Sequence, residues 1–164
     1  MEQLWAPWRM RYVSTASGTP PGCVFCAALA SGDDGEALIV CRGKRAFLIL
    51  NAYPYASGHL MAALNRHGCS LVDASAAEMQ ETMALTQRAM RALQATYRPH
   101  GFNIGVNEGR VAGAGMPDHL HVHIVPRWDG DTNFMAAIGE TKVIPEALGV
   151  THERLSAALR SFDQ

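Results

Sequence analysis

Short apolar runs divided by turn residues predict strands on both sides of a single long helix. The predicted strands cover residues 37–41, 46–50, 59–64, 102–106 and 119–126. After the third strand, Ser75 and Glu78 have the spacing of a capping box that begins a helix, which Pro99 ends. The apolar residues that recur at helical spacing, and that we expect to face the core, are Met79, Met83, Met90, Leu93 and Tyr97.

Two shorter helices are expected nearer the ends of the chain. A small-residue stretch after Cys26 predicts a helix that ends near Gly32. A last helix is marked by apolar residues between 155 and 162, with Thr151 as its cap. Strands joined by hairpins, then one long helix and further strands, predict an α+β domain in which the helix packs on an antiparallel sheet.

The strand near residue 120 has the most informative pattern, Asp-His-Leu-His-Val-His-Ile-Val-Pro-Arg-Trp over residues 118–128. Successive side chains of a strand point to opposite faces, so His119, His121 and His123 share one face and the aliphatic residues between them fill the other. Because a buried imidazole must find a polar partner, three in a row are unfavourable as ordinary core residues. Metal binding, phosphate binding and nucleophilic catalysis remain as interpretations.

The length of 164 residues suits a single domain, in which we distinguish an N-terminal arm and loop (1–22), a catalytic domain (23–138) and a C-terminal extension with a short helix (139–164). A net charge of −1 gives no basis for binding a nucleic acid polymer. No apolar run approaches the roughly 20 residues of a membrane span, and no leader is evident, so we expect a cytoplasmic protein. Its four cysteines are then expected to be reduced or metal-bound.

Cys23 and Cys26 form a C-x-x-C pair, which suits either a redox centre or half of a metal site. Redox pairs of this type sit between a strand and a helix, and the coil-like surroundings expected here do not supply that setting. We therefore favour a structural zinc, with His67 and His119 completing a tetrahedral Cys₂His₂ set.

A glycine-rich loop lies directly before the histidine strand. Gly113 and Gly115 leave backbone N–H groups open to an anion, because glycine has no Cβ to block the approach. The loop by itself is a weak signal, but its position beside three imidazoles is typical of a phosphate site. Backbone donors would hold the phosphate oxygens while a neutral histidine attacks phosphorus.

The chain resembles the histidine triad (HIT) family. His119-Leu-His-Val-His-Ile-Val fits the family pattern, and the other family elements occur in the same order between residues 23 and 127. These are Cys23-x-x-Cys26, Asn51-x-x-Pro54-x-x-x-Gly58-His59, Arg66-His67 and Asn107. The Trp-Ala-Pro-Trp-Arg-Met arm and the run after Pro126 further resemble the branch of bacterial diadenosine tetraphosphate phosphorylases and related nucleotide transferases.

The resemblance implies an antiparallel sheet that joins a second one in a homodimer, and a substrate that is an adenine nucleotide or a dinucleoside polyphosphate. It implies that His121 attacks the α-phosphorus to form an adenylyl-histidine, which water or orthophosphate resolves. His123 would bond the phosphate or leaving-group oxygen, and His119 would hold zinc or complete the site. Asn51 matches a ribose contact and Asn107 a position beside the phosphates.

One departure from the family bears on the reaction. Many members carry glutamine and then serine or threonine where this chain has Gly115 and Met116, so a hydroxyl that could assist the leaving group is missing. This argues against phosphoramidate hydrolysis and leaves phosphorolysis of a dinucleoside polyphosphate as the preferred activity. The alternatives are a HIT-family hydrolase or phosphoramidase, a non-catalytic nucleotide-binding protein, and a redox or zinc-handling protein.

Overall fold

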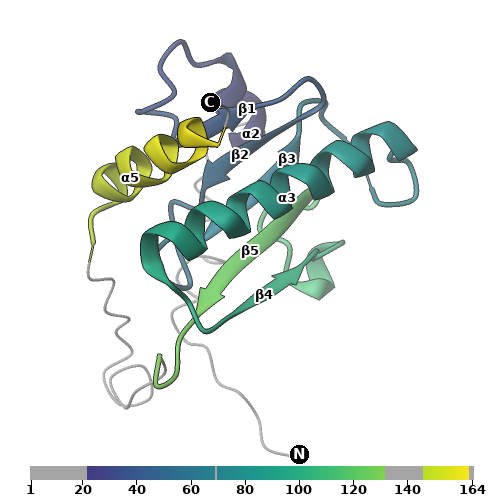
Figure 1. The fold of residues 1–164 in the computed structure, drawn as a ribbon. Helices are drawn as coiled ribbons and strands as arrows, with labels where there is room; N and C mark the ends of the chain where they lie inside the picture. The colour runs from purple at the N-terminus through teal and green to yellow at the C-terminus, as the bar shows by residue number, and fades with distance from the viewer. Residues whose placement is uncertain (1–21, 69, 132–145, 163–164) are drawn as a thin grey trace, which may run out of the picture.

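A computed structural model describes residues 22–68, 70–131 and 146–162. Within them, the strands form one antiparallel sheet of five strands in the order β1-β2-β3-β5-β4 (Figure 1). The strands are β1 (Ile39–Arg42), β2 (Ala46–Leu50), β3 (Leu60–Leu64), β4 (Gly101–Gly105) and β5 (His121–Arg127). The predicted α+β fold is confirmed, and each predicted strand overlaps an observed one.

The first predicted strand lies two residues early, because the chain enters β1 through a tight turn. Leu38 has a positive φ of 59°, and the N–H of Ile39 donates to the carbonyl of Asp34. The last predicted strand also begins later than expected, at His121. His119 and Leu120 lie just before it, where the N–H of Leu64 donates to the carbonyl of Leu120.

The long helix α3 (Ala76–Tyr97) begins as predicted: the Ser75 hydroxyl accepts the N–H of Glu78, and the Glu78 carboxylate accepts the N–H of Ser75. Its buried face differs from the expected methionine stripe. Met83 is 45% exposed, and Met79 and Met90 are only partly buried. The buried positions recur at spacings of three and four residues and are mostly small or aliphatic: Thr82, Leu85, Thr86, Ala89, Ala92 and Leu93.

The two shorter helices correct two sequence predictions. Helix α2 (Val24–Ala30) begins before Cys26 rather than after it, with Cys23 as its N-cap residue. Helix α5 (Leu148–Ser161) has Ala147 as its N-cap, so Thr151 does not cap it. Thr151 is instead buried in the first turns, where its hydroxyl donates to the Glu146 carboxylate at 2.8 Å.

The sheet has helices on both faces (Figure 1). Helices α3 and α5 cover one face, and their aliphatic side chains form the main core with alternate residues of β2, β3 and β5. Helix α2 covers the opposite face, where Phe25 packs against Phe47, Ile49, Met61 and Ala63. The histidine strand therefore presents its aliphatic residues to α3 and its histidines to the side of α2.

The loop from Asn51 to His59 is fixed against α3 by a glycine. Gly58 has a positive φ of 76°, and a Cβ on it would lie 2.7 Å from the Leu93 Cδ2 atom. Only glycine combines this conformation with so close an approach to a helix. Substitution there would displace the loop that leads into β3.

None of the helices in the described part of the chain has the length and apolar character needed to cross a membrane. The predicted arm lies outside the described residues except for Gly22, and the extension is described only from residue 146. The proposed division into arm, domain and extension stays a prediction.

Glu78 connects the start of α3 to the loop that follows β3, so we expect Glu78→Gln to lower the melting temperature by a few degrees at pH 7. The Arg66 guanidinium, 2.6 Å away, and the hydrogen bonds from Ser75 lower the pKa of Glu78 from 4.5 to about 2. A carboxyl whose pKa is lowered by folding stabilises the protein above its ordinary pKa, and that stabilisation is lost as pH falls from 4.5 towards 2.

Thermal melts of the wild type and the variant at several pH values test this prediction. The difference between them should shrink as pH falls through the acidic range. Glu153→Gln, at an exposed position on α5, is the matched control and should melt like the wild type. A Glu78→Gln variant with an unchanged melting temperature at pH 7 would contradict the prediction.

Candidate functional site

The pairing of β3 with β5 places the histidines. Met61 pairs with His123 and Ala63 with His121, so both imidazoles lie on the face that α2 covers. His119 and His121 are buried, at 1% and 5% exposure, whereas His123 is half-buried. The predicted alternation is confirmed, and the exposure of the three histidines increases from His119 to His123.

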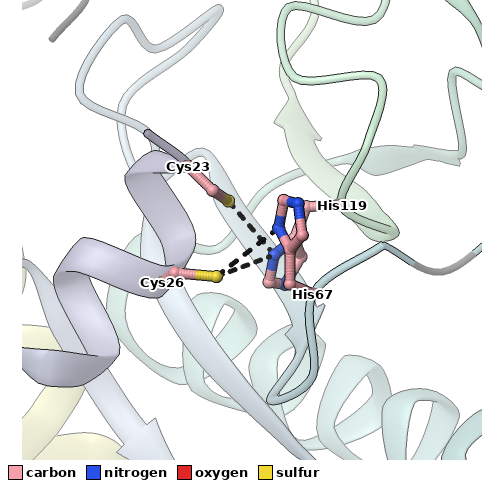
Figure 2. A group of neighbouring side chains, drawn as sticks. All are labelled: Cys23, Cys26, His67 and His119. Atoms are coloured by element: carbon pink, nitrogen blue, oxygen red, sulfur yellow. Dashed lines mark hydrogen bonds between the residues drawn. The ribbon is translucent and has the colours of Figure 1, made fainter. Parts of the chain in front are cut away.

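Four predicted metal ligands, among them the first histidine of the triad, come together (Figure 2). One ligand atom from each of Cys23, Cys26, His67 and His119 lies within 4.8 Å of the others. The Cys23 sulfur is 3.2 Å from His119 Nδ1, and the Cys26 sulfur is 3.5 Å from His67 Nδ1. Cys23 is the N-cap residue of α2 and Cys26 lies in its first turn, whereas His67 follows β3 and His119 precedes β5 at the same end of this antiparallel strand pair.

The orientation of His119 suits a metal. Its Nε2 lies 2.6 Å from the carbonyl oxygen of Leu64, which can only accept, so Nε2 carries the proton and Nδ1 turns a lone pair towards the thiols. Burial lowers the pKa of His119, which favours this neutral form. Two thiols and two imidazoles are a closed tetrahedral set, with no position left open for chemistry.

The surroundings of the two cysteines differ from the coil that the sequence suggested. Cys23 caps a helix and Cys26 lies in its first turn, a setting that redox pairs also use. The two histidines in the cluster distinguish the alternatives, because a redox pair does not need them. Burial raises the pKa of the Cys26 thiol, the opposite of what activates a redox cysteine.

A backbone carbonyl just before β5 determines the tautomer of His121. Its Nδ1 lies 2.7 Å from the carbonyl oxygen of His119, so Nδ1 carries the proton and Nε2 keeps the lone pair. Burial lowers the pKa of His121, so the imidazole is neutral near pH 7. A neutral imidazole with a free Nε2 lone pair can attack an electrophilic phosphorus.

His123 is linked to the Asn51 loop through His59. The His59 Nε2 lies 3.0 Å from His123 Nδ1, and the buried His59 ring receives the N–H of Tyr55 at Nδ1. The Asn51 carboxamide also lies 3.4 Å from this nitrogen, while its oxygen accepts the N–H of Tyr53. Asn51 and His123, far apart in the sequence, thus belong to one hydrogen-bonded group.

Two aromatic residues of the site were not predicted. Phe25 is 2% exposed, and its ring centroid lies 4.9 Å from that of His119 and 4.7 Å from that of His121. Tyr55 packs on His59 and His123, at centroid distances of 4.7 Å and 6.0 Å. The position of Phe25 between two cysteines was the available signal, because a helix that carries metal ligands must also bury an apolar side chain.

The glycine-rich loop differs in part from expectation. Gly113 has a φ of 85° and ends a short 3₁₀ turn, η2 (Arg110–Ala112). Its N–H donates to the carbonyl of Arg110, so this N–H is not open to an anion as predicted. Gly115 is exposed, and Met116 packs against the apolar cluster under α2. Gly113 therefore shapes the loop, and Gly115 remains as a candidate donor.

Asn107 follows the end of β4. Pairing between β4 and β5 ends at Gly105, which lies opposite His123, and Asn107 is two residues further along the chain. Asn107 therefore lies in the segment that joins β4 to the glycine-rich loop. The cluster of predicted metal ligands and the triad are joined through Phe25, which packs on His119 and His121, and through the contact of His121 with His123.

Comparison with known proteins agrees with this geometry. A family model described as HIT domain matches residues 34–130. The chain is 43% identical over 163 residues to a protein of Mycobacterium tuberculosis named AP-4-A phosphorylase, covering 95% of this chain and 83% of the relative. It is 28% identical over 127 residues to an uncharacterized HIT-like protein of Mycoplasma genitalium, covering 75% of this chain and 85% of that protein.

Solved structures share the fold. A Zn-bound histidine triad family protein from Mycobacterium smegmatis superposes with a TM-score of 0.70 at 26% identity, covering 87% of this chain and 96% of that one. A hypothetical histidine triad nucleotide-binding protein from Sulfolobus tokodaii gives a TM-score of 0.69 at 21% identity, with 86% and 94% of the two chains covered. The second likeness supports the fold alone.

Proposed function

The chain belongs to the histidine triad (HIT) family, and we propose that it is a nucleotide phosphorylase that cleaves dinucleoside polyphosphates such as diadenosine tetraphosphate. The observation that carries this proposal is the state of His121: a buried, neutral imidazole whose Nδ1 proton is engaged by a backbone carbonyl and whose Nε2 lone pair is available. A protein that only binds nucleotides has no need of a nucleophile prepared in this way. The named activity of the relative from Mycobacterium tuberculosis supports the same substrate class.

The proposed reaction has two displacements at one phosphorus atom. The Nε2 atom of His121 attacks the α-phosphorus of diadenosine tetraphosphate, so that a P–N bond forms, a P–O bond breaks and ATP leaves. An orthophosphate oxygen then attacks the adenylyl group on His121, the P–N bond breaks, and ADP is released. The sum converts diadenosine tetraphosphate and orthophosphate into ATP and ADP, and no redox partner is required.

The neighbouring residues take supporting roles in this proposal. His123, beside the nucleophile, would donate a hydrogen bond to the leaving-group oxygen. Asn51 would bind the ribose hydroxyls, since its carboxamide has a second N–H and a second lone pair beyond those used in the loop. Asn107 and the backbone at Gly115 would contact the phosphates. Met116, where the family pattern described above has a hydroxyl, is an apolar side chain that does not activate water.

We further propose that the metal held by Cys23, Cys26, His67 and His119 is zinc, with a structural role. Zinc would fix α2 against the strand that carries the triad, and it would take no part in the reaction because all four positions are filled by protein. Through Phe25, which packs on His119 and His121, α2 would in turn hold the nucleophile in place.

The homodimer and the cytoplasmic location stay proposals of the same kind. Strand β4 lies at one edge of the sheet, and an edge strand can pair with a second copy. The apolar side chain of Ile104 on this strand is 43% exposed, and a second copy paired with β4 would contact it. The cysteines of the described residues form no disulfide, as suits the reducing cytoplasm.

Metal analysis tests the zinc proposal. We expect about one zinc per chain, as follows from a closed four-ligand site, and we expect Cys23→Ala to lose the metal and to lower the melting temperature. Cys41→Ala is the matched control, because Cys41 lies on β1 outside the cluster, and it should retain zinc. Wild-type protein without stoichiometric zinc after purification free of chelators would refute the proposal.

The phosphorylase proposal is tested by product analysis with diadenosine tetraphosphate, with and without orthophosphate. Orthophosphate should raise the rate and convert the adenylyl half into ADP rather than AMP. His121→Ala should lower turnover by roughly 10⁴-fold or more, as removal of a nucleophile does, while nucleotide binding remains. His152→Ala, a histidine on α5, should leave turnover unchanged.

Two results would contradict the proposal in different ways. Release of AMP and ATP at the same rate with or without orthophosphate would identify a hydrolase. Turnover by His121→Ala at the wild-type rate would mean that His121 is not the nucleophile.

A further inference from the structure

The loop between β2 and β3 places the backbone N–H of Tyr55 beside His59, which in turn contacts His123. This contact determines which nitrogen carries the proton in each of the two imidazoles. The N–H of Tyr55 lies 3.0 Å from the Nδ1 atom of His59. A peptide N–H can only donate, so Nδ1 must accept. The Asn51 amide group, 3.4 Å from the same nitrogen, also donates, because the Asn51 oxygen is oriented by the N–H of Tyr53. Two donors thus meet at Nδ1, and the proton of neutral His59 is on Nε2.

The same constraint passes to the next ring. The Nε2 atom of His59 lies 3.0 Å from the Nδ1 atom of His123. Since His59 Nε2 carries the proton, it donates, and His123 Nδ1 accepts. The proton of neutral His123 is then on Nε2, the nitrogen on the far side of the ring from His59. Because His59 is 0% exposed, water does not compete for either of its nitrogens.

The Tyr55 ring also packs on both imidazoles of this relay. Its plane lies at 24° to the ring of His123, and its centroid is 4.7 Å from that of His59. Tyr55 therefore acts on His59 twice, through its peptide N–H and through its ring. The loop itself is fixed by Gly58 against Leu93 of α3, so the donor is held in place by the core.

We propose that Tyr55 is a positioning residue whose peptide N–H, through His59, fixes the proton of His123 on Nε2, so that His123 meets the leaving group as a hydrogen-bond donor. The catalytic consequence rests on the proposed function, in which a nucleotide oxygen departs beside His123. With the opposite tautomer, His123 would present a lone pair to that oxygen and would repel its developing charge.

The proton positions are measured without substrate by long-range ¹H–¹⁵N NMR of protein labelled at histidine, at about pH 8, above the ordinary imidazole pKa of about 6.5. We expect His59 and His123 to carry the proton on Nε2 in the wild type. In His59→Leu, which removes the donor, His123 should shift towards the Nδ1-protonated form. His59→Gln, which has both a donor and an acceptor, should restore the Nε2 form in part.

Substitutions at Tyr55 separate the peptide donor from the ring. Tyr55→Ala keeps the N–H and should keep the tautomer of His123. Tyr55→Pro removes the N–H, and His123 should then shift towards the Nδ1-protonated form. The His59 variants carry the test if the proline variant does not fold. His100→Leu, the same change as His59→Leu at an exposed histidine, is the matched control and should leave the His123 signals unchanged.

Kinetics with diadenosine tetraphosphate complete the test. In His59→Leu we expect kcat to fall by about 10-fold or more, a part of the roughly 10²- to 10⁴-fold effect of a placed proton donor, while KM changes little. A wild-type His123 protonated on Nδ1, an unchanged His123 tautomer in His59→Leu, or an unchanged kcat in that variant would overturn the proposal. Because the NMR needs no substrate, a failure of the relay is distinguished from a failure of the phosphorylase assignment.

Discussion

The register between β3 and β5 is the constraint on which the rest of the structure depends. Met61 opposite His123 and Ala63 opposite His121 put the imidazoles on one face and the aliphatic residues of the same strand on the other. A slip of one residue would turn the histidines into the core under α3 and expose Val122 to the site. The fully buried aliphatic residues on the α3 side make such a slip unfavourable, so the core that stabilises the fold also determines the face on which His121 lies.

Backbone groups then determine what each histidine can do. His119 gives its Nε2 proton to the carbonyl of Leu64 and turns Nδ1 to the thiols, whereas His121 gives its Nδ1 proton to the carbonyl of His119 and keeps Nε2 for chemistry. Two histidines that are two residues apart in the sequence thus have opposite tautomers, one suited to a metal and the other to nucleophilic attack. Their shared neighbour Phe25 joins the two environments into one packed unit.

The sequence was sufficient where a short-range pattern carries the information. The alternation of residues 119–124, the capping box at Ser75 and Glu78, and the bounds of β2 are local features, and the structure agrees with each. The clustering of Cys23 and Cys26 with His67 and His119 was also predicted, because the ligand types of a metal site are restricted.

What could not be predicted depends on contacts between distant segments. Met83 has helical spacing with Met79 and Met90, yet the stripe that α3 turns to the sheet runs through Thr82, Leu85 and Ala89, so Met83 lies outside it. Thr151 resembles a cap in the sequence, but it lies inside α5, where its hydroxyl donates to the Glu146 carboxylate. The tautomers of the histidines likewise follow from carbonyls and N–H groups whose positions only the folded chain defines.

A covalent adenylyl group on His121 is the central claim, and the stereochemistry at phosphorus tests it most directly. Each in-line displacement inverts the configuration at phosphorus, so two in succession restore it. Diadenosine tetraphosphate with one sulfur of known configuration at the α-phosphorus should therefore give the thio-analogue of ADP with retained configuration, as resolved by ³¹P NMR. Inversion would mean that orthophosphate attacks the substrate directly and that His121 is not the nucleophile.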